Sequence, residues 1–152
     1  MCGIAGFGSC QIYMPKRGVH TCIDFHGKTP LAATPDYWLG EDGKPIGWFD
    51  AVPGGKSVGV PGTPALLQHL HDKHGALGRQ RLAAPAIALA EEGFPVSPRL
   101  AASVAAAADR GLSAFPVAAQ YFFPGGEPLA EGAILKNLVL ARSFRRFAAE
   151  GA

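Results

Sequence analysis

Prolines divide this sequence into a part in which no long helix can form and a part that is built for helices. Proline kinks or breaks a helix when it lies beyond the first turn, and five prolines interrupt the stretch between His26 and Gly62. From Thr63 onward the chain instead carries Thr63-Pro64 and Ser97-Pro98, pairs typical of helix starts. We therefore expect a hairpin and irregular loops over residues 1–62 and a helical segment over 63–152, together forming a single partial domain.

The first 25 residues predict a β-hairpin. Cys10–Tyr13 leads into a turn over Met14–Gly18, which contains a proline and a glycine. Residues 19–25 then alternate apolar and polar side chains, the pattern of a strand with one covered face. Two strands make a poor sheet by themselves, so this pattern indicates further strands or a missing partner.

Four helices are expected in the second part. Their predicted ranges are residues 63–74, 82–92, 97–110 and 138–150, and glycines follow the first three. The last carries one apolar stripe, formed by Leu140, Phe144, Phe147 and Ala148. A hairpin followed by about four helices is an α+β fold.

Composition excludes several classes of function. The chain has 152 residues, is 48% apolar and carries a formal net charge of +2, too small to indicate a nucleic acid or an acidic membrane as partner. It has no run long enough to span a bilayer and no signal peptide, so as written it would be cytoplasmic, and its localisation is left open.

Neither cysteines nor histidines predict a metal site. The three cysteines are Cys2, Cys10 and Cys22, and they lack the spacing of zinc ligands. A Cys10–Cys22 disulfide and free thiols both remain open. The histidines of residues 69–74 have no carboxylate or cysteine set to complete a metal shell, so a solvated helix face is the better interpretation. We expect no metal and no organic cofactor.

Three stretches, in this order, resemble the γ-glutamyltransferase (γ-glutamyl transpeptidase) family of N-terminal nucleophile hydrolases. They are the glycine-rich start with the following hairpin and loop (residues 3–13, 23–25 and 30–36), the motif VGVPGT within 57–63, and PAIALAEEGFPVS within 82–97. Asn137 and residues 140–142 resemble the family's next helix. The resemblance implies that the chain is a segment of an αββα sandwich and that the complete enzyme hydrolyses or transfers γ-glutamyl groups of amides and peptides such as glutathione.

The same resemblance implies that this chain lacks the nucleophile. The family uses a threonine that becomes the first residue of the small subunit, and no threonine here has that setting. We therefore expect a large-subunit segment that is inactive alone, has no catalytic residue of its own, and needs a small-subunit polypeptide or associates with itself.

One residue is a candidate for substrate binding. The family's strand ending in Asp-Phe is followed by an arginine that holds the α-carboxylate of the γ-glutamyl group, and His26 occupies that position here. Histidine cannot make the forked contact of a guanidinium, so the acyl substrate is left open. The alternative for His26 is a polar loop residue without a role.

Two other functions remain as alternatives. The opening MCGIAGF resembles class II glutamine amidotransferases, in which Cys2 would be the nucleophile of a glutaminase, but their RGPD, GHRRL and NGEIYN motifs are absent. The second alternative is a non-catalytic interaction module.

Overall fold

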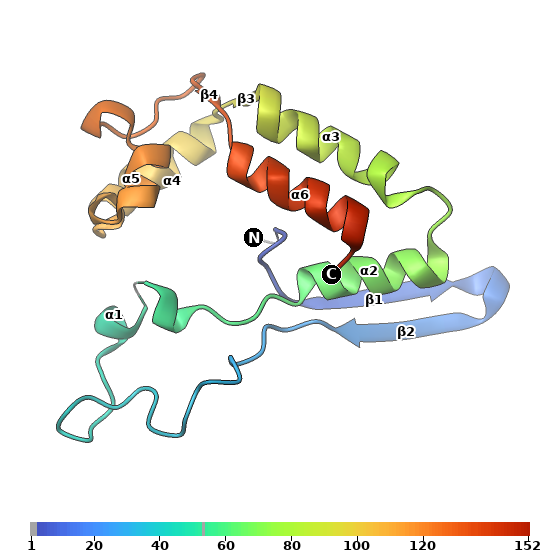
Figure 1. Cartoon of the computed structure of the whole chain (residues 1–152), viewed down its shortest axis with the longest axis horizontal. Helices are drawn as coiled ribbons and strands as arrows, with labels where there is room; N and C mark the ends of the chain where they lie inside the picture. The colour runs from blue at the N-terminus through green and yellow to red at the C-terminus, as the bar shows by residue number, and fades with distance from the viewer. Residues whose placement is uncertain (1–2, 53) are drawn as a thin grey trace. The chain divides into compact units, whose positions relative to one another are not determined.

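The computed structural model describes residues 3–52 and 54–152, which form two compact units. The first unit extends to Ala76 and includes the last two residues of the chain, and the second is Leu77–Glu150 (Figure 1). The expectation of a single partial domain stays a prediction.

The hairpin of the first unit is present as predicted. Strands β1 (Ser9–Met14) and β2 (Val19–Asp24) pair antiparallel along their whole length, and a 3₁₀ turn over Pro15–Arg17 joins them (Figure 1). Gly18 closes the turn with a φ of 64°, a conformation that glycine adopts without strain. The amide of Phe25 donates to the carbonyl of Gly8 at 2.9 Å, so the pairing continues one step beyond β2.

The register of the hairpin excludes the Cys10–Cys22 disulfide. Cys10 lies opposite Ile23, whereas Cys22 lies opposite Gln11. Successive side chains of a strand point to opposite faces, so the two sulfur atoms lie on opposite sides of the hairpin. Both thiols are free.

Residues 25–62 are irregular, as the prolines predicted. The stretch at 34–38 forms hydrogen-bonded turns without a helix, and a single bridge joins Lys28 to Val60. A second bridge joins Leu39 to Pro45. The short helix α1 (Trp48–Ala51) was not predicted, because four residues carry no periodic signal.

Helix α2 (Thr63–His74) closes the first unit and has the predicted bounds. Thr63 is buried as the first helical residue, and Gly62 occupies the cap position that we expected Thr63 to take. No group of histidine, cysteine and carboxylate side chains in the described residues could hold a metal ion. Within that same part of the chain, every helix is too short or too polar to cross a membrane.

The second unit contains four helices and a small two-stranded sheet. The helices are α3 (Arg79–Glu92), α4 (Pro98–Ala108), α5 (Pro116–Phe122) and α6 (Leu138–Glu150). Helix α5 lies outside the predicted ranges. Strands β3 (Phe94–Pro95) and β4 (Ile134–Leu135) pair antiparallel. The buried core of the unit consists of Val96, Val104, Phe123, Leu129 and Leu135.

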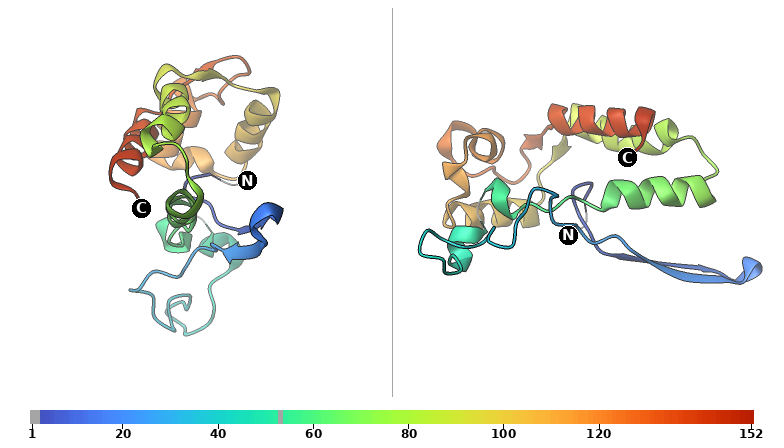
Figure 2. Two further views of the ribbon diagram at one scale, coloured as in Figure 1. Left: turned by 90° about the vertical axis from the view of Figure 1, so that its right-hand side faces the viewer. Right: turned by 60° about the horizontal axis from the view of Figure 1, so that its bottom comes forward.

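Helices α3 and α6 lie side by side (Figures 1 and 2). The predicted apolar stripe of α6 faces inward, with Ala148 fully buried and the three larger side chains half-buried. The Arg145 guanidinium donates two hydrogen bonds to Glu91, Nε to Oε1 at 2.9 Å and Nη2 to Oε2 at 2.6 Å, and lowers the pKa of that carboxyl. This forked contact ties the exposed edges of the two helices together.

Candidate functional site

A cavity of about 440 Å³ lies in the first unit, and His26 is part of its wall. The residues that follow β2 form one side of this cavity, and the segment 56–61 forms another. The aromatic side chains of Phe7, Tyr37 and Trp38 also contribute. A cavity of this size can accommodate a small ligand.

Close backbone contacts bring these distant segments together. Lys28 and Val60 exchange two hydrogen bonds, at 3.1 and 2.8 Å, and the amide of Thr63 donates to the carbonyl of Gly6 at 3.2 Å. Gly62 lies directly against the carbonyl of Phe25, where a Cβ atom would be only 1.9 Å from the oxygen. The glycine of the VGVPGT motif therefore allows the entry of α2 to pack on the end of β2, next to His26.

His26 is held by Asp24. Its backbone amide and its ring Nδ1 both lie within hydrogen-bond distance of Asp24 Oδ1, at 3.0 and 2.6 Å. These contacts lower the pKa of the Asp24 carboxyl, and the backbone hydrogen bond from His26 has the largest effect. A carboxylate only accepts, so Nδ1 carries the proton and Nε2 is left as the acceptor of the neutral ring. The ring of Phe7 lies 5.4 Å from the imidazole, between ring centroids.

Positive charge gathers on the same cavity. Lys28 and Lys56 line it with His26, and no carboxylate among the described residues lies within 4.0 Å of either ammonium group. The Lys56 Nζ atom lies 5.0 Å from the ring centre of Tyr37 and 5.6 Å from that of Trp38. The Tyr37 hydroxyl donates to the carbonyl of Lys56 at 3.0 Å, which fixes this arrangement.

The arrangement can bind an anionic or polar group, but it holds no activated nucleophile among the residues that the structure describes. Ser57 lines the cavity, yet its hydroxyl faces the carbonyl oxygens of Val52 and Gly54 at 2.6 and 3.0 Å, and neither is a base.

Of the residues that line this cavity, the sequence singled out only His26 as a candidate for substrate binding. It missed Tyr37, Trp38 and Lys56, which lie in the irregular region. The only signal there was the Gly-Gly-Lys-Ser sequence of residues 54–57, which resembles the end of a phosphate-binding loop but lacks its first glycine.

The model of the Gamma-glutamyltranspeptidase family matches residues 1–152 of the chain. The chain belongs to this family. It is 39% identical over 151 residues to the glutathione hydrolase proenzyme of Bacillus subtilis, an alignment that covers 99% of the chain and 25% of that protein. The chain thus spans about a quarter of the length of the curated relatives it matches.

Solved structures agree with the family assignment. The γ-glutamyltranspeptidase of Helicobacter pylori superimposes with a TM-score of 0.87 at 30% identity, over 96% of this chain and 41% of that one. A cephalosporin acylase from Bacillus halodurans gives a TM-score of 0.74 at 26% identity, over 97% and 27% of the two chains. The predicted α+β fold is confirmed as that of a γ-glutamyltranspeptidase segment.

The comparisons do not favour the glutaminase alternative. Cys2, on which that alternative depended, lies outside the described residues.

Proposed function

We propose that this chain provides the acyl-binding part of a γ-glutamyltransferase-like enzyme, with His26 in the substrate cavity. The complete enzyme would attack a γ-glutamyl or related amide, form an acyl-enzyme, and pass the acyl group to water or an amine. A threonine carried by a partner polypeptide would be the nucleophile, and no cofactor is needed. The observation that carries this proposal is the place of His26 on the cavity wall, where the family resemblance puts a substrate-binding arginine.

The chemistry of His26 sets what the cavity can recognise. With Nδ1 held by Asp24, only Nε2 is free to meet a ligand, as an acceptor when the ring is neutral and as a donor when it is protonated. An arginine would instead donate two parallel hydrogen bonds to a carboxylate. We therefore propose weaker recognition of the γ-glutamyl carboxylate here than in relatives with the arginine.

Exposed apolar surface supports the need for a partner. The accessible surface of the chain is 11060 Å². A globular protein of 15.8 kDa exposes roughly 7,300 Å², and two separate globules of half that mass roughly 8,800 Å². The excess includes large side chains that are more than four-fifths exposed: Leu31, Phe49 and Val117. Surface of this kind is typical of an interface, either with a small-subunit polypeptide or with a second copy.

Sedimentation of the purified chain, with a hydrophobic dye added in parallel, tests this need. We expect self-association or strong dye binding in the absence of a partner. A monomer that binds no dye would contradict the proposed partner and favour an independent interaction module.

A chimera tests the function of the cavity. The aligned part of this chain would replace the matching quarter of the Bacillus subtilis glutathione hydrolase proenzyme, and self-cleavage and γ-glutamyl hydrolysis would be followed. We expect the chimera to self-cleave and to hydrolyse the γ-glutamyl substrate with a raised KM. His26→Arg should lower that KM roughly tenfold, because one charge-assisted contact contributes about 1.5–3 kcal/mol. Lys44→Gln, at an exposed lysine in the irregular region between the hairpin and α2, is the matched control and should leave the KM unchanged.

Two results would contradict the proposal. A folded chimera that fails to self-cleave would show that this chain does not replace the family segment. An unchanged KM in both His26→Arg and His26→Ala would show that His26 does not contribute to substrate binding.

A further inference from the structure

A second cavity lies beside the first one. It measures about 560 Å³, and its wall is almost wholly apolar apart from Ser57. The residues that line it are Trp38, Pro45, Ile46, Trp48, Ala51, Val52 and Ser57. Trp38 and Ser57 also line the cavity that contains His26, so the two cavities share these side chains.

Specific contacts within the loop build this second cavity. The amide of Ile46 donates to the carbonyl of Trp38 at 2.9 Å, and Leu39 pairs with Pro45, so the apolar pair 45–46 is held beside Trp38. Helix α1 contributes Trp48 from the other end of the same loop. The hydroxyl of Ser57 donates to the carbonyl of Val52 at 2.6 Å and ties the end of α1 to the shared wall.

The positive charge of the first cavity lies at this shared wall. The Lys56 ammonium is 5.6 Å from the ring centre of Trp38, the indole that borders both cavities. A ligand that places a flat apolar group between the indoles would therefore bring an attached carboxylate near Lys56. Lys28 and His26 also line the first cavity.

We propose that the two cavities together bind an aryl carboxylate, with the aryl group between Trp38 and Trp48 and the carboxylate at Lys56. This inference rests on the proposed substrate cavity and names the class of acyl group that it takes. An acyl group with an aromatic end fits the apolar cavity. Its carboxylate can pair with the Lys56 ammonium, which has no carboxylate within 4.0 Å in the described part of the chain and interacts with that of Asp36 only at longer range.

The two tryptophans make the proposal directly measurable. They are the only tryptophans of the sequence, and both line the apolar cavity, with Trp48 74% and Trp38 40% exposed. A ligand that enters this cavity shields them from water, so intrinsic fluorescence reports occupancy of the cavity itself.

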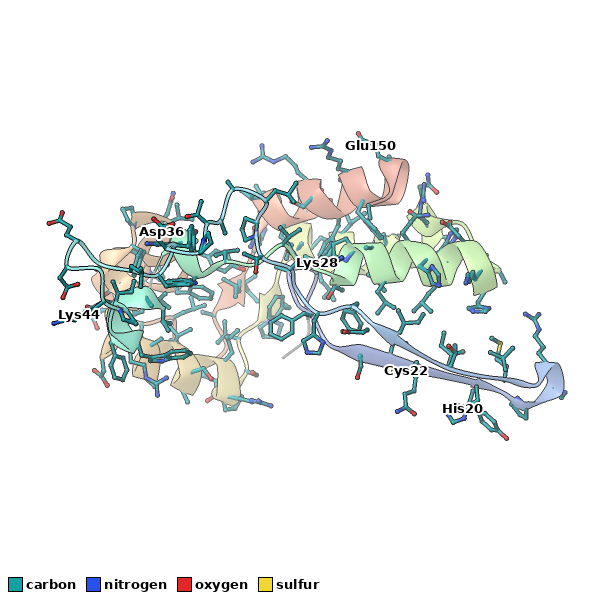
Figure 3. The ribbon with its side chains drawn as sticks, turned by 90° about the horizontal axis from the view of Figure 1, so that it is seen from below. His20, Cys22, Lys28, Asp36, Lys44 and Glu150 are labelled. Atoms are coloured by element: carbon teal, nitrogen blue, oxygen red, sulfur yellow. The ribbon has the colours of Figure 1, made fainter. Side chains whose placement is uncertain are left out.

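The experiment is a fluorescence titration of the purified full chain with 3-phenylpropionate, its uncharged amide, and propionate. We expect a saturable change with 3-phenylpropionate, roughly fivefold weaker binding of the amide, and no change with propionate, since the charge and the aryl group each contribute. Lys56→Gln should bring the affinity for 3-phenylpropionate down to that for the amide and leave the amide unaffected. Lys44→Gln, at a lysine that lines neither cavity and lies well away from Lys28 (Figure 3), should change neither affinity.

A second pair of variants tests the aryl site. Trp48→Ala should weaken both aryl ligands alike, with Trp38 left as the reporter, whereas Phe49→Ala on the same helix should not, because Phe49 is 87% exposed and lines neither cavity. Equal binding of acid and amide, an equal response to propionate, or no saturable change at all would overturn the inference. None of these results depends on the γ-glutamyl turnover of the chimera, so the two proposals can fail independently of each other.

Discussion

Replacing Gly62 by alanine tests how the cavity is held together. A Cβ atom at this position would lie 1.9 Å from the carbonyl oxygen of Phe25, whereas ordinary contacts begin near 3.4 Å. The two backbones would have to separate by about 1.5 Å, the difference between these distances. No flexible side chain can yield, because the nearest atoms belong to the backbone. Overpacking of this kind costs about 1–3 kcal/mol, and a backbone clash belongs at the upper end of that range.

The measurement is urea unfolding of the Gly62→Ala chain, followed by circular dichroism. We expect the free energy of unfolding to fall by about 3 kcal/mol, at an unchanged dependence on urea concentration. The displaced carbonyl directly precedes His26, so the ring protons of His26 should also shift in the NMR spectrum. A shift of this kind would show that the clash reaches the cavity wall.

Gly55→Ala is the matched control. Its Cβ would meet no atom within 4 Å, and its backbone lies outside the left-handed region. We expect its stability to stay within about 1 kcal/mol of the parent chain, with any change toward greater stability. Equal stability of the two variants would refute the close packing of the α2 entry on the end of β2.

Three further predictions concern single contacts. Asn137→Ala should lower the free energy of unfolding by about 1 kcal/mol, measured in urea, because the Asn137 side chain accepts an amide at the start of α6 at 2.8 Å. The pKa of the Asp24 carboxyl, followed by NMR, should lie below 3.8. It should rise only partly in His26→Ala, since the backbone hydrogen bond from residue 26, which lowers this pKa most, survives the substitution. The stability that the Asp24 carboxylate contributes is present above its unfolded pKa and is lost as the pH falls through its folded pKa. Mild oxidation should leave Cys10 and Cys22 unbridged to each other in a non-reducing peptide map, and an intramolecular bridge would contradict the hairpin register.

Local signals were enough to predict most of the elements. Ser97 caps α4 by accepting the amide of Leu100 at 3.2 Å, which the Ser-Pro pair indicated. Gly93 ends α3 at a φ of 90°, and the apolar stripe of α6 is covered over the predicted range. The hairpin was equally readable, because its turn and its alternation lie within 25 residues. In each of these cases the deciding interaction joins residues a few positions apart.

The start of α3 shows where such signals fail. The helix begins at Arg79, three residues before the predicted start at Leu82, and Pro85 lies inside it. Residues 79–81 are polar and carry no apolar period, so nothing in the sequence marks them as helical. The strands β3 and β4 were missed for a related reason, since two-residue strands have no alternation to read.

The cavity itself could not be predicted from local patterns. Its wall contains both His26 and Lys56, which are 30 positions apart in the sequence. They are brought together by the backbone pairing of residues 28 and 60, which no sequence periodicity predicts. Long-range partners of this kind follow from tertiary packing, which also decides the Glu91–Arg145 contact across 54 positions. Only the family resemblance, through its arginine position, indicated that residue 26 mattered.

The exchange of a guanidinium for an imidazole changes how a carboxylate can be oriented in this cavity. A planar arginine fixes both the position and the direction of a carboxylate by two parallel hydrogen bonds, whereas the Lys56 ammonium attracts it as a point charge without fixing its direction. A cavity that attracts its ligand by a point charge needs other contacts to fix the orientation of that ligand. The Trp38 indole lies beside that charge and lines the apolar cavity together with Trp48, and aromatic stacking there would restrict the orientation of a bound ring. In the proposed site, selectivity would therefore depend on the apolar end of the ligand, and we expect that enlarging or removing the aryl group alters affinity more than moving the carboxylate by one methylene.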